Sequence, residues 1–306
     1  MYDLHRLRLL RELKHRGTLA QVANALGYSP SAVSQQLSLL AREVGQPLLE
    51  PCGRGVVLTP AAEIVVEHTE AILREMELAR AEVAATRSEL TGLIRLATFQ
   101  TAAHTFVPAA ISRLHDLHPG VSVGFSHIGA EDALPALRAG DFDLVLSEQY
   151  PGLLPHRAPG AETINLLEDP LLLAVPAGWE ASGLTDLAHR PWAMEHPGTD
   201  PRELADGVCR AAGFVPHIAY QSADVHLHVR LVEQGDAAAF LPALALPDQP
   251  SFQVLPAAAD PDGTGPGPHR SLLLSRRSGS AVDPAITALA EQLRDAAGRG
   301  GAPTGG

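Results

Sequence analysis

The first ninety residues carry apolar side chains every three or four positions, a spacing that predicts helices. Residues 3–16 have leucines on one side and basic residues around the other. Two more helical patterns occupy residues 20–45, separated by a tight break at Gly27-Tyr28-Ser29. Ser29 suits an N-cap and Pro30 the first helical position. Such a short break predicts two helices that cross steeply, either in a DNA-binding helix-turn-helix or in an ordinary helical hairpin.

The segment that follows this helix pair has a strand pattern instead of a helical one. Two short apolar runs flank the tip Gly53-Arg54-Gly55, which predicts a β-hairpin. Thr59-Pro60 then opens a helix that meets no glycine and no further proline before Glu89. Its apolar and small positions are spaced by four and three residues, as in a coiled coil: Val65, Thr69, Ile72, Met76, Ala79, Val83, Thr86 and Leu90. Pairing with a second copy is the favoured interpretation, and packing against the chain's own C-terminal part is the alternative.

Beyond Thr91-Gly92, short strand patterns alternate with helical ones, which predicts a parallel sheet covered by helices on both faces. The order of these elements indicates two α/β lobes joined by two crossings. We therefore divide the chain into a domain at residues 1–58, a linker helix at 59–90, a two-lobed domain at 91–298 and a disordered tail at 299–306. Lobe I takes about 91–162 and 268–298, and lobe II about 163–267. The loose, proline-rich stretch 150–161 is expected to lack regular structure.

Charge is unevenly distributed along the 306 residues. The net charge is −12, yet residues 1–58 hold seven Arg and Lys against four acids, a balance of +3, so the remainder carries −15. A basic head fits a DNA partner because distant charges are screened at a phosphate backbone. No apolar run is long enough for a membrane helix or a signal core, so a cytoplasmic protein with no membrane contact is expected. Two cysteines give no disulfide framework.

The N-terminal motifs resemble those of LysR-type transcriptional regulators. The residues that carry the likeness are Ala25-Leu26, Ser29 to Leu37, Gly45, Pro47-Leu48, Gly53-Arg54-Gly55 and Leu58 to Ala61. The family implies a winged helix-turn-helix followed by a two-lobed effector domain like a periplasmic binding protein. It also implies a dimer through the linker helix, with a tetramer as an open alternative. The chain departs from the family at Leu49, Pro51, Gln35 and Ala62. Leu49 and Ala62 change no charge. Pro51 and Gln35 stand where the family has basic residues, so positive charge is lost there.

DNA contacts are expected on the outer side of the second helix of the pair. Short polar side chains that could read base edges lie there: Ser31, Ser34, Gln35 and Ser38. The resemblance maps Pro30, Ser31, Ser34 and Gln35 onto the groove-reading positions and Arg54 onto the wing tip. Double-stranded DNA is therefore the predicted macromolecular partner.

Effector contacts are expected where strands of the two lobes end, because ligands of open α/β sheets bind at the carboxyl ends of strands. Lobe I supplies Thr98, Phe99, Gln100, Thr101, His127 and Gly129. Lobe II supplies Glu195, His196, Thr199, Ser222, Asp224, Phe240 and Pro242. Thr101 and Thr199 are open to a second interpretation as helix caps. The histidines, above all His127, favour an acidic effector.

An enzyme on the two-lobed body is the competing hypothesis. The chain shows no G-x-S-x-G motif, phosphate loop, H-E-x-x-H motif or dinucleotide fingerprint where chemistry would need one. The histidine pairs lack ligand spacing to other metal-binding side chains, so no metal and no cofactor are expected. Cys52, near Arg54, leaves a redox role open. The preferred hypothesis is a regulator whose DNA binding responds to an effector between the lobes.

Overall fold

The computed structural model describes residues 1–53, 55–86, 89–154, 160–257 and 267–300. Three helices form the N-terminal domain: α1 (Leu4–Arg16), α2 (Leu19–Leu26) and α3 (Pro30–Val44). Their ends follow the sequence signals, since Ser29 accepts a hydrogen bond from the Ala32 N–H, and Gly45 ends α3 with a positive φ of 81°. A buried cluster that includes Leu10, Val22, Leu37 and Leu48 holds the helices together. The predicted steep helix pair is therefore present.

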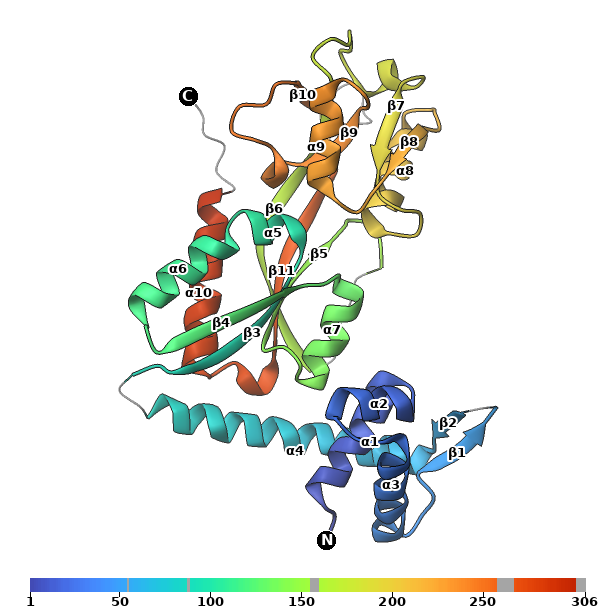
Figure 1. Cartoon of the computed structure of the whole chain (residues 1–306), viewed down its shortest axis with the longest axis vertical. Helices are drawn as coiled ribbons and strands as arrows, with labels where there is room; N and C mark the ends of the chain where they lie inside the picture. The colour runs from blue at the N-terminus through green and yellow to red at the C-terminus, as the bar shows by residue number, and fades with distance from the viewer. Residues whose placement is uncertain (54, 87–88, 155–159, 258–266, 301–306) are drawn as a thin grey trace.

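The wing follows α3 as a two-stranded antiparallel sheet of β1 (Leu49–Cys52) and β2 (Gly55–Leu58). Arg54, the predicted tip contact, lies outside the described residues. Thr59 accepts a hydrogen bond from the Ala62 N–H and starts α4 (Pro60–Ala85). This helix crosses the molecule beneath the two lobes and joins the N-terminal domain to them (Figure 1).

The predicted apolar seam of α4 is divided between two uses. Thr69 is buried and Val65 packs against the N-terminal core, so these two positions are occupied within the chain. Ile72, Met76 and Val83 are exposed and lie on one side of the helix. Another face of α4 packs on the chain's own lobe I, where Glu77 pairs with Arg277. Packing against the chain's own C-terminal part is thus confirmed for one face, and pairing with a second copy through the exposed positions stays a prediction.

Lobe I is built on β3 (Gly92–Thr98), β4 (Val121–His127) and β5 (Leu144–Gln149), which run parallel. Helices α6 (Val107–Leu117) and α10 (Pro284–Gly300) pack together, and their residues share one buried cluster with the sheet. Helix α7 (Ala130–Ala139) belongs to a separate cluster with β5. The short α5 (Gln100–His104) follows β3, and the turn η3 (Ser278–Ser280) rests on α4. The sequence pattern predicts helices on both faces of this sheet.

The sheet itself differs from the prediction because it is mixed. Its order is β10-β6-β11-β5-β3-β4, and β9 also pairs with β6. Strands β6 (Ala161–Val175) and β11 (His269–Arg277) pair antiparallel with each other and β11 also with β5. From the sequence a strand is predicted only over residues 170–175, because the acidic residues Glu162, Glu168 and Asp169 obscure the first half of β6. That half is the crossing between the lobes, and its backbone is paired with β11 along residues 161–170.

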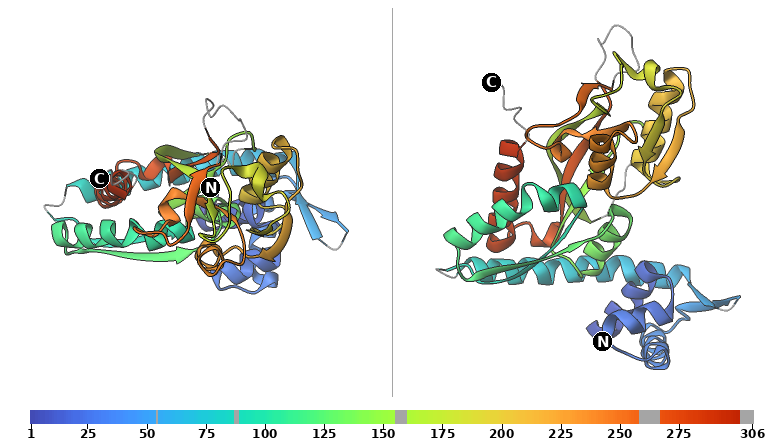
Figure 2. Two further views of the ribbon diagram at one scale, coloured as in Figure 1. Left: turned by 90° about the horizontal axis from the view of Figure 1, so that it is seen from above. Right: turned by 45° about the horizontal axis from the view of Figure 1, so that its top comes forward.

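Lobe II contains β7 (Pro191–Met194) parallel to β8 (His217–Gln221), with β9 (Ala239–Pro242) and the unpredicted β10 (Gln253–Pro256) on β6. Helices α8 (Asp200–Ala211) and α9 (Val225–Gln234) and the turns η1 (Leu184–Leu187) and η2 (Ala243–Ala245) complete it. Figure 2 shows the lobes one above the other, with the N-terminal domain set apart from lobe II. Helix α10 extends to Gly300, so residues 299 and 300 are helical and not a tail, and 301–306 lie outside the described residues.

No helix in the described residues combines the length and apolar character needed to cross a membrane.

Candidate DNA-binding and effector-binding sites

The outer side of α3 is open to solvent. Pro30, Ser31, Gln35 and Ser38 are exposed and Ser34 is half-buried, while Val33 and Leu37 on the opposite side enter the core. The Ser38 hydroxyl donates to the Ser34 carbonyl at 2.9 Å. No described residue of the two-lobed domain covers this side, so the predicted groove-reading face is available to a duplex.

Two neighbouring glutamines of α3 differ in their surroundings. Gln35 is exposed, whereas Gln36 accepts a hydrogen bond from Arg6 Nε at 3.0 Å. Arg6 also pairs with Glu43. The basic residues of α1 do not form a purely solvated surface. Arg6, Lys14 and Arg16 form ion pairs with other elements of the chain, and Arg11 pairs with Glu12 of the same helix. Sequence reasoning also missed Tyr28, which is exposed before the start of α3.

A cavity of about 290 Å³ lies between the two lobes. Eight of the predicted effector residues line it: Phe99, Gln100, Thr101, His127, Gly129, Glu195, Phe240 and Pro242. The rule that placed them holds because β3 and β4 end at this edge of the sheet and α5 begins there. Phe240 and Pro242 lie within β9 rather than after it.

Five predicted residues do not line this cavity: Thr98, His196, Thr199, Ser222 and Asp224. Thr98 is fully buried and its hydroxyl donates to the Phe99 carbonyl, while the Thr199 hydroxyl donates to the His196 carbonyl at 2.9 Å. Ser222 accepts from the Asp224 N–H at 3.0 Å. These hydroxyl groups therefore form hydrogen bonds with backbone atoms of their own turns.

Asp224 joins the lobes. It accepts hydrogen bonds from the His226 and Leu227 N–H groups at the start of α9, and Gln100 Nε2 donates to the same carboxylate at 2.7 Å. Gln100 Oε1 in turn accepts from the Val225 N–H at 3.2 Å. Gln100 thus connects lobe I to the N-terminal turn of α9 in lobe II.

Several cavity residues were missed by sequence reasoning. Arg270 from β11 is buried between Glu148 and Asp169, donating to Asp169 from Nε at 2.9 Å and from Nη2 at 2.7 Å. Burial alone would lower the pKa of Arg270, but the two carboxylates outweigh it and raise that pKa. The sequence gives no local pattern that predicts this ion-pair group, because Glu148, Asp169 and Arg270 lie on three different strands.

Glu195 and His228 also line the cavity. Burial, followed by repulsion from Glu148, raises the pKa of Glu195 to about 7. Burial lowers the pKa of His228, whose ring interacts with the Ser222 backbone while its Nε2 atom is buried without a hydrogen-bond partner in the described structure. A neutral imidazole that donates through Nδ1 presents Nε2 as an acceptor. The cavity thus combines a carboxyl group of raised pKa with a buried acceptor that lacks a donor.

A winged helix-turn-helix with its reading face exposed, a long linker helix and a two-lobed domain with a cavity between the lobes define a class of DNA-binding, effector-responsive regulators. Family models agree. "LysR substrate binding domain" matches residues 87–298, and "Bacterial regulatory helix-turn-helix protein, lysR family" matches residues 4–63. The chain belongs to the LysR family of bacterial transcriptional regulators.

Curated relatives are named as regulators. One is the "Probable hydrogen peroxide-inducible genes activator" of Mycobacterium avium. It is 27% identical over 290 residues, which cover 93% of this chain and 91% of the relative. Another is the "HTH-type transcriptional regulator GalR" of Pseudomonas putida. It is 28% identical over 301 residues, which cover 96% of this chain and 74% of the relative. The protein is thus a transcriptional regulator with an effector-binding domain, and not an enzyme.

Solved structures share the fold. A cysteine-to-aspartate variant of full-length OxyR from Pseudomonas aeruginosa matches with a TM-score of 0.66 and 20% identity, covering 96% of this chain and 95% of the other. CbnR complexed with its target DNA matches with a TM-score of 0.52 and 23% identity, covering 96% and 99%. At this identity the likeness concerns the fold alone.

Proposed function

We propose that this regulator reads its operator through Pro30, Ser31, Ser34, Gln35 and Ser38 of α3, with Arg54 of the wing contacting phosphate. The support is the exposed outer side of α3, whose short polar side chains suit base-edge contacts. Because its target is chromosomal DNA, we place the protein in the cytoplasm. The exposed stripe Ile72, Met76 and Val83 supports a dimer through α4.

We further propose that the cavity between the lobes binds the effector. The observation that carries this proposal is that the half-buried Glu195 and the buried acceptor His228 Nε2, which has no donor in the described residues, line one cavity. An effector that donates hydrogen bonds satisfies both. Glu195 with a pKa of about 7 is readily ionised beside a positive charge. The effector we infer is therefore a small molecule with a protonated amine.

The expectation of an acidic effector stays a prediction, and the cavity charges favour the amine instead. Arg270, the cation in the lining, is already engaged by Glu148 and Asp169. Peroxide sensing, suggested by the names of some relatives, finds no support at Cys209. That thiol is buried, and burial raises its pKa to about 12, so the reactive thiolate is scarce at neutral pH.

A binding screen tests the proposal. Small primary amines, amino acids and carboxylates of matched size are titrated into the full-length protein, and the melting temperature is followed at pH 7.5. We expect amine-bearing compounds to stabilise the protein and a Glu195→Gln variant to lose that response. Stabilisation by carboxylates alone, retained in the variant, would show that the effector is acidic and bound elsewhere.

A further inference from the structure

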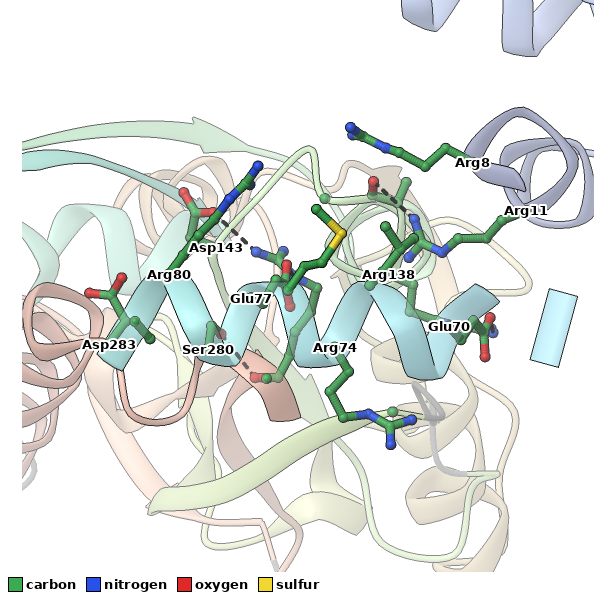
Figure 3. Close-up of a pocket in the computed structure, with 18 of the residues that line it drawn as sticks. Arg8, Arg11, Glu70, Arg74, Glu77, Arg80, Arg138, Asp143, Ser280 and Asp283 are labelled. Carbon is green, nitrogen blue, oxygen red and sulfur yellow. Dashed lines mark hydrogen bonds and ion pairs between the residues drawn. The ribbon is translucent and has the colours of Figure 1, made fainter. Parts of the chain in front are cut away.

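A second cavity, of about 440 Å³, lies between the DNA-binding domain, the linker helix and the base of lobe I (Figure 3). Helix α1 contributes Arg8 and Arg11, α4 contributes Arg80, and the lobe I side contributes Arg95 and Arg277. The lining shares no residue with the effector cavity. A molecule bound here would touch all three parts of the chain at once.

The charge of this cavity is opposite to that of the chain. Seven arginines line it against four carboxylates, a surplus of three positive charges in a protein with a net charge of −12. Part of the charge is compensated within the chain. Arg95 donates to both oxygens of Asp143, at 2.8 and 3.1 Å, and Arg277 donates from Nε to Glu77 at 2.6 Å. The carboxylates Asp143 and Glu77 are therefore already engaged.

The remaining cations are not matched. Arg8 and Arg80 are exposed at the cavity and have no ion pair with any residue that the structure describes. Arg11 is largely buried and shares Glu12 with Arg16, while its Nε atom is enclosed and has no acceptor in the described chain. Burial, with a contribution from the nearby Arg277, lowers the pKa of Arg11. Arg11 and Arg16 therefore share the single carboxylate of Glu12, which leaves α1 with an excess of positive charge beside the cavity.

We propose that this cavity binds a small anion with at least two negative charges, such as a metabolite that carries a diphosphate. Arg8 from α1 and Arg80 from α4 approach the space from two sides (Figure 3). Guanidinium groups form forked, charge-assisted hydrogen bonds with phosphate oxygens, which suits a diphosphate between them. Arg11 lines the same space and adds its positive charge to the site.

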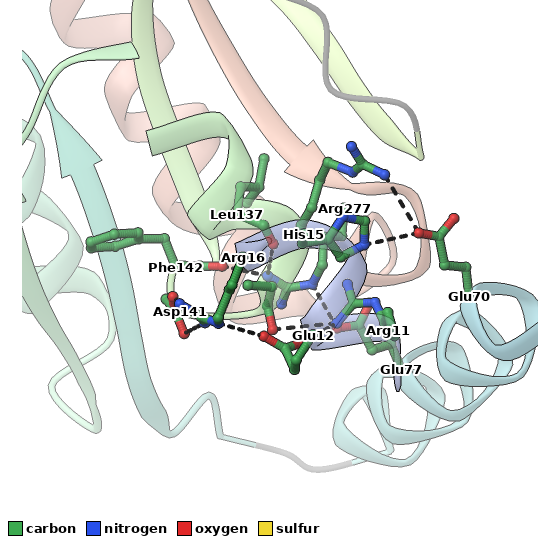
Figure 4. Close-up of polar contacts among 12 residues, drawn as sticks. Arg11, Glu12, His15, Arg16, Glu70, Glu77, Leu137, Asp141, Phe142 and Arg277 are labelled. Carbon is green, nitrogen blue, oxygen red and sulfur yellow. Dashed lines mark hydrogen bonds and ion pairs between the residues drawn. The ribbon is translucent and has the colours of Figure 1, made fainter. Parts of the chain in front are cut away.

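The site has a consequence for regulation, because it lies where the DNA-binding domain docks on lobe I. Arg16 of α1 pairs with Asp141 of lobe I at 2.8 Å, and His15 of α1 contacts Glu70 of α4 (Figure 4). Glu70 also accepts from Arg138 at 3.4 Å. An anion held by α1, α4 and lobe I together adds to these contacts. It therefore favours the docked arrangement, in which the position of α3 is fixed relative to the effector domain.

Calorimetric titration of the full-length protein with inorganic pyrophosphate tests the site without DNA and without any ligand of the effector cavity. Wild type should bind pyrophosphate saturably, and the double variant Arg8→Gln/Arg80→Gln should bind it at least about tenfold more weakly, as expected for lost charge-assisted hydrogen bonds. Because both side chains are exposed, the variant should keep the melting temperature of wild type. Citrate, titrated in parallel, distinguishes a phosphate-specific site from one that accepts any multivalent anion.

Two matched variants control for charge. Arg113→Gln removes an exposed arginine of α6 outside the cavity, and Arg42→Gln removes one from α3, where a polyanion would bind if it used the DNA-binding surface. Both should bind pyrophosphate like wild type. Equal loss in Arg42→Gln or Arg113→Gln, unchanged binding in the double variant, or a change of oligomeric state in place of pyrophosphate binding would overturn the proposal.

Discussion

Gln100 Nε2 lies 2.7 Å from Asp224 Oδ1, and this hydrogen bond joins lobe I directly to lobe II beside the effector cavity that Gln100 lines. Asp224 is at the same time the N-cap of α9, so the bond ties the end of β3 to the start of that helix. The Asp224 carboxylate has a lowered pKa: burial would raise it, but the hydrogen bonds from Gln100 and from the α9 backbone prevail. Gln100 therefore donates to an ionised acceptor, and the inter-lobe hydrogen bond is charge-assisted.

We expect Gln100→Ala to weaken effector binding by about tenfold, because the closed arrangement of the lobes loses one charge-assisted hydrogen bond. Calorimetry with the amine identified by the screen measures the change. Asp248→Ala, at an exposed acid of lobe II outside the cavity lining, is the control and should bind like wild type. Equal affinities for Gln100→Ala and wild type would mean that the bond does not contribute to closure.

The two glutamines of α3 should give opposite phenotypes. Gln35→Ala should reduce discrimination between operator variants by about 1 to 3 kcal/mol, the range for a good base contact, with the melting temperature unchanged. Gln36→Ala removes the acceptor of Arg6 and should lower the melting temperature while base preference is kept. Binding of labelled operator variants and thermal melts of both proteins distinguish them. If Gln35→Ala kept every base preference, the groove-reading face would have to be reassigned.

Glu195 should make stability depend on pH. Its folded-state pKa is about 7 because burial and Glu148 disfavour the charge, whereas the unfolded value is near 4.5. Between these values the folded protein holds a proton that the unfolded chain has released, so stability falls as pH rises through this window. We expect Glu195→Gln to remove this fall and to be more stable than wild type at pH 8 by on the order of 2 kcal/mol.

Denaturant unfolding at pH 5 and pH 8 measures the Glu195 effect as a difference between wild type and variant. His15 contributes with the opposite sign. Burial, with Arg138 and Arg11, lowers its pKa to about 4, so its contribution rises with pH between about 4 and 6.5 in both proteins and cancels in the difference. A pH-independent difference would show that Glu195 titrates normally.

The α4 stripe should control assembly. We expect Ile72→Asp and Val83→Asp to dissociate the oligomer at micromolar concentration, because each places a charge within an apolar contact. Ala71→Asp introduces the same charge at an exposed position of α4 outside the stripe and should leave assembly unchanged. Sedimentation analysis reports the masses. An unchanged mass for both stripe variants would assign the interface to another surface.

Local sequence patterns account for the helices and the wing of the N-terminal part. Caps at Ser29 and Thr59, the glycine at Gly45 and helical periodicity define α1 to α4 and the wing, because these signals act within a few residues of chain. The rule that ligands bind at strand ends also found much of the cavity, including Gln100 and Glu195, since it depends only on where strands stop.

Contacts between residues that are distant in the chain follow from the packing of the fold and not from local patterns. Arg270 is buried between Glu148 and Asp169 because β11 pairs with β5 and β6, and this antiparallel pairing makes the sheet mixed although its local pattern resembles that of a parallel one. The arginine cavity likewise forms because α1, α4 and lobe I pack together. Such contacts join residues far apart in the chain, and no local periodicity records them.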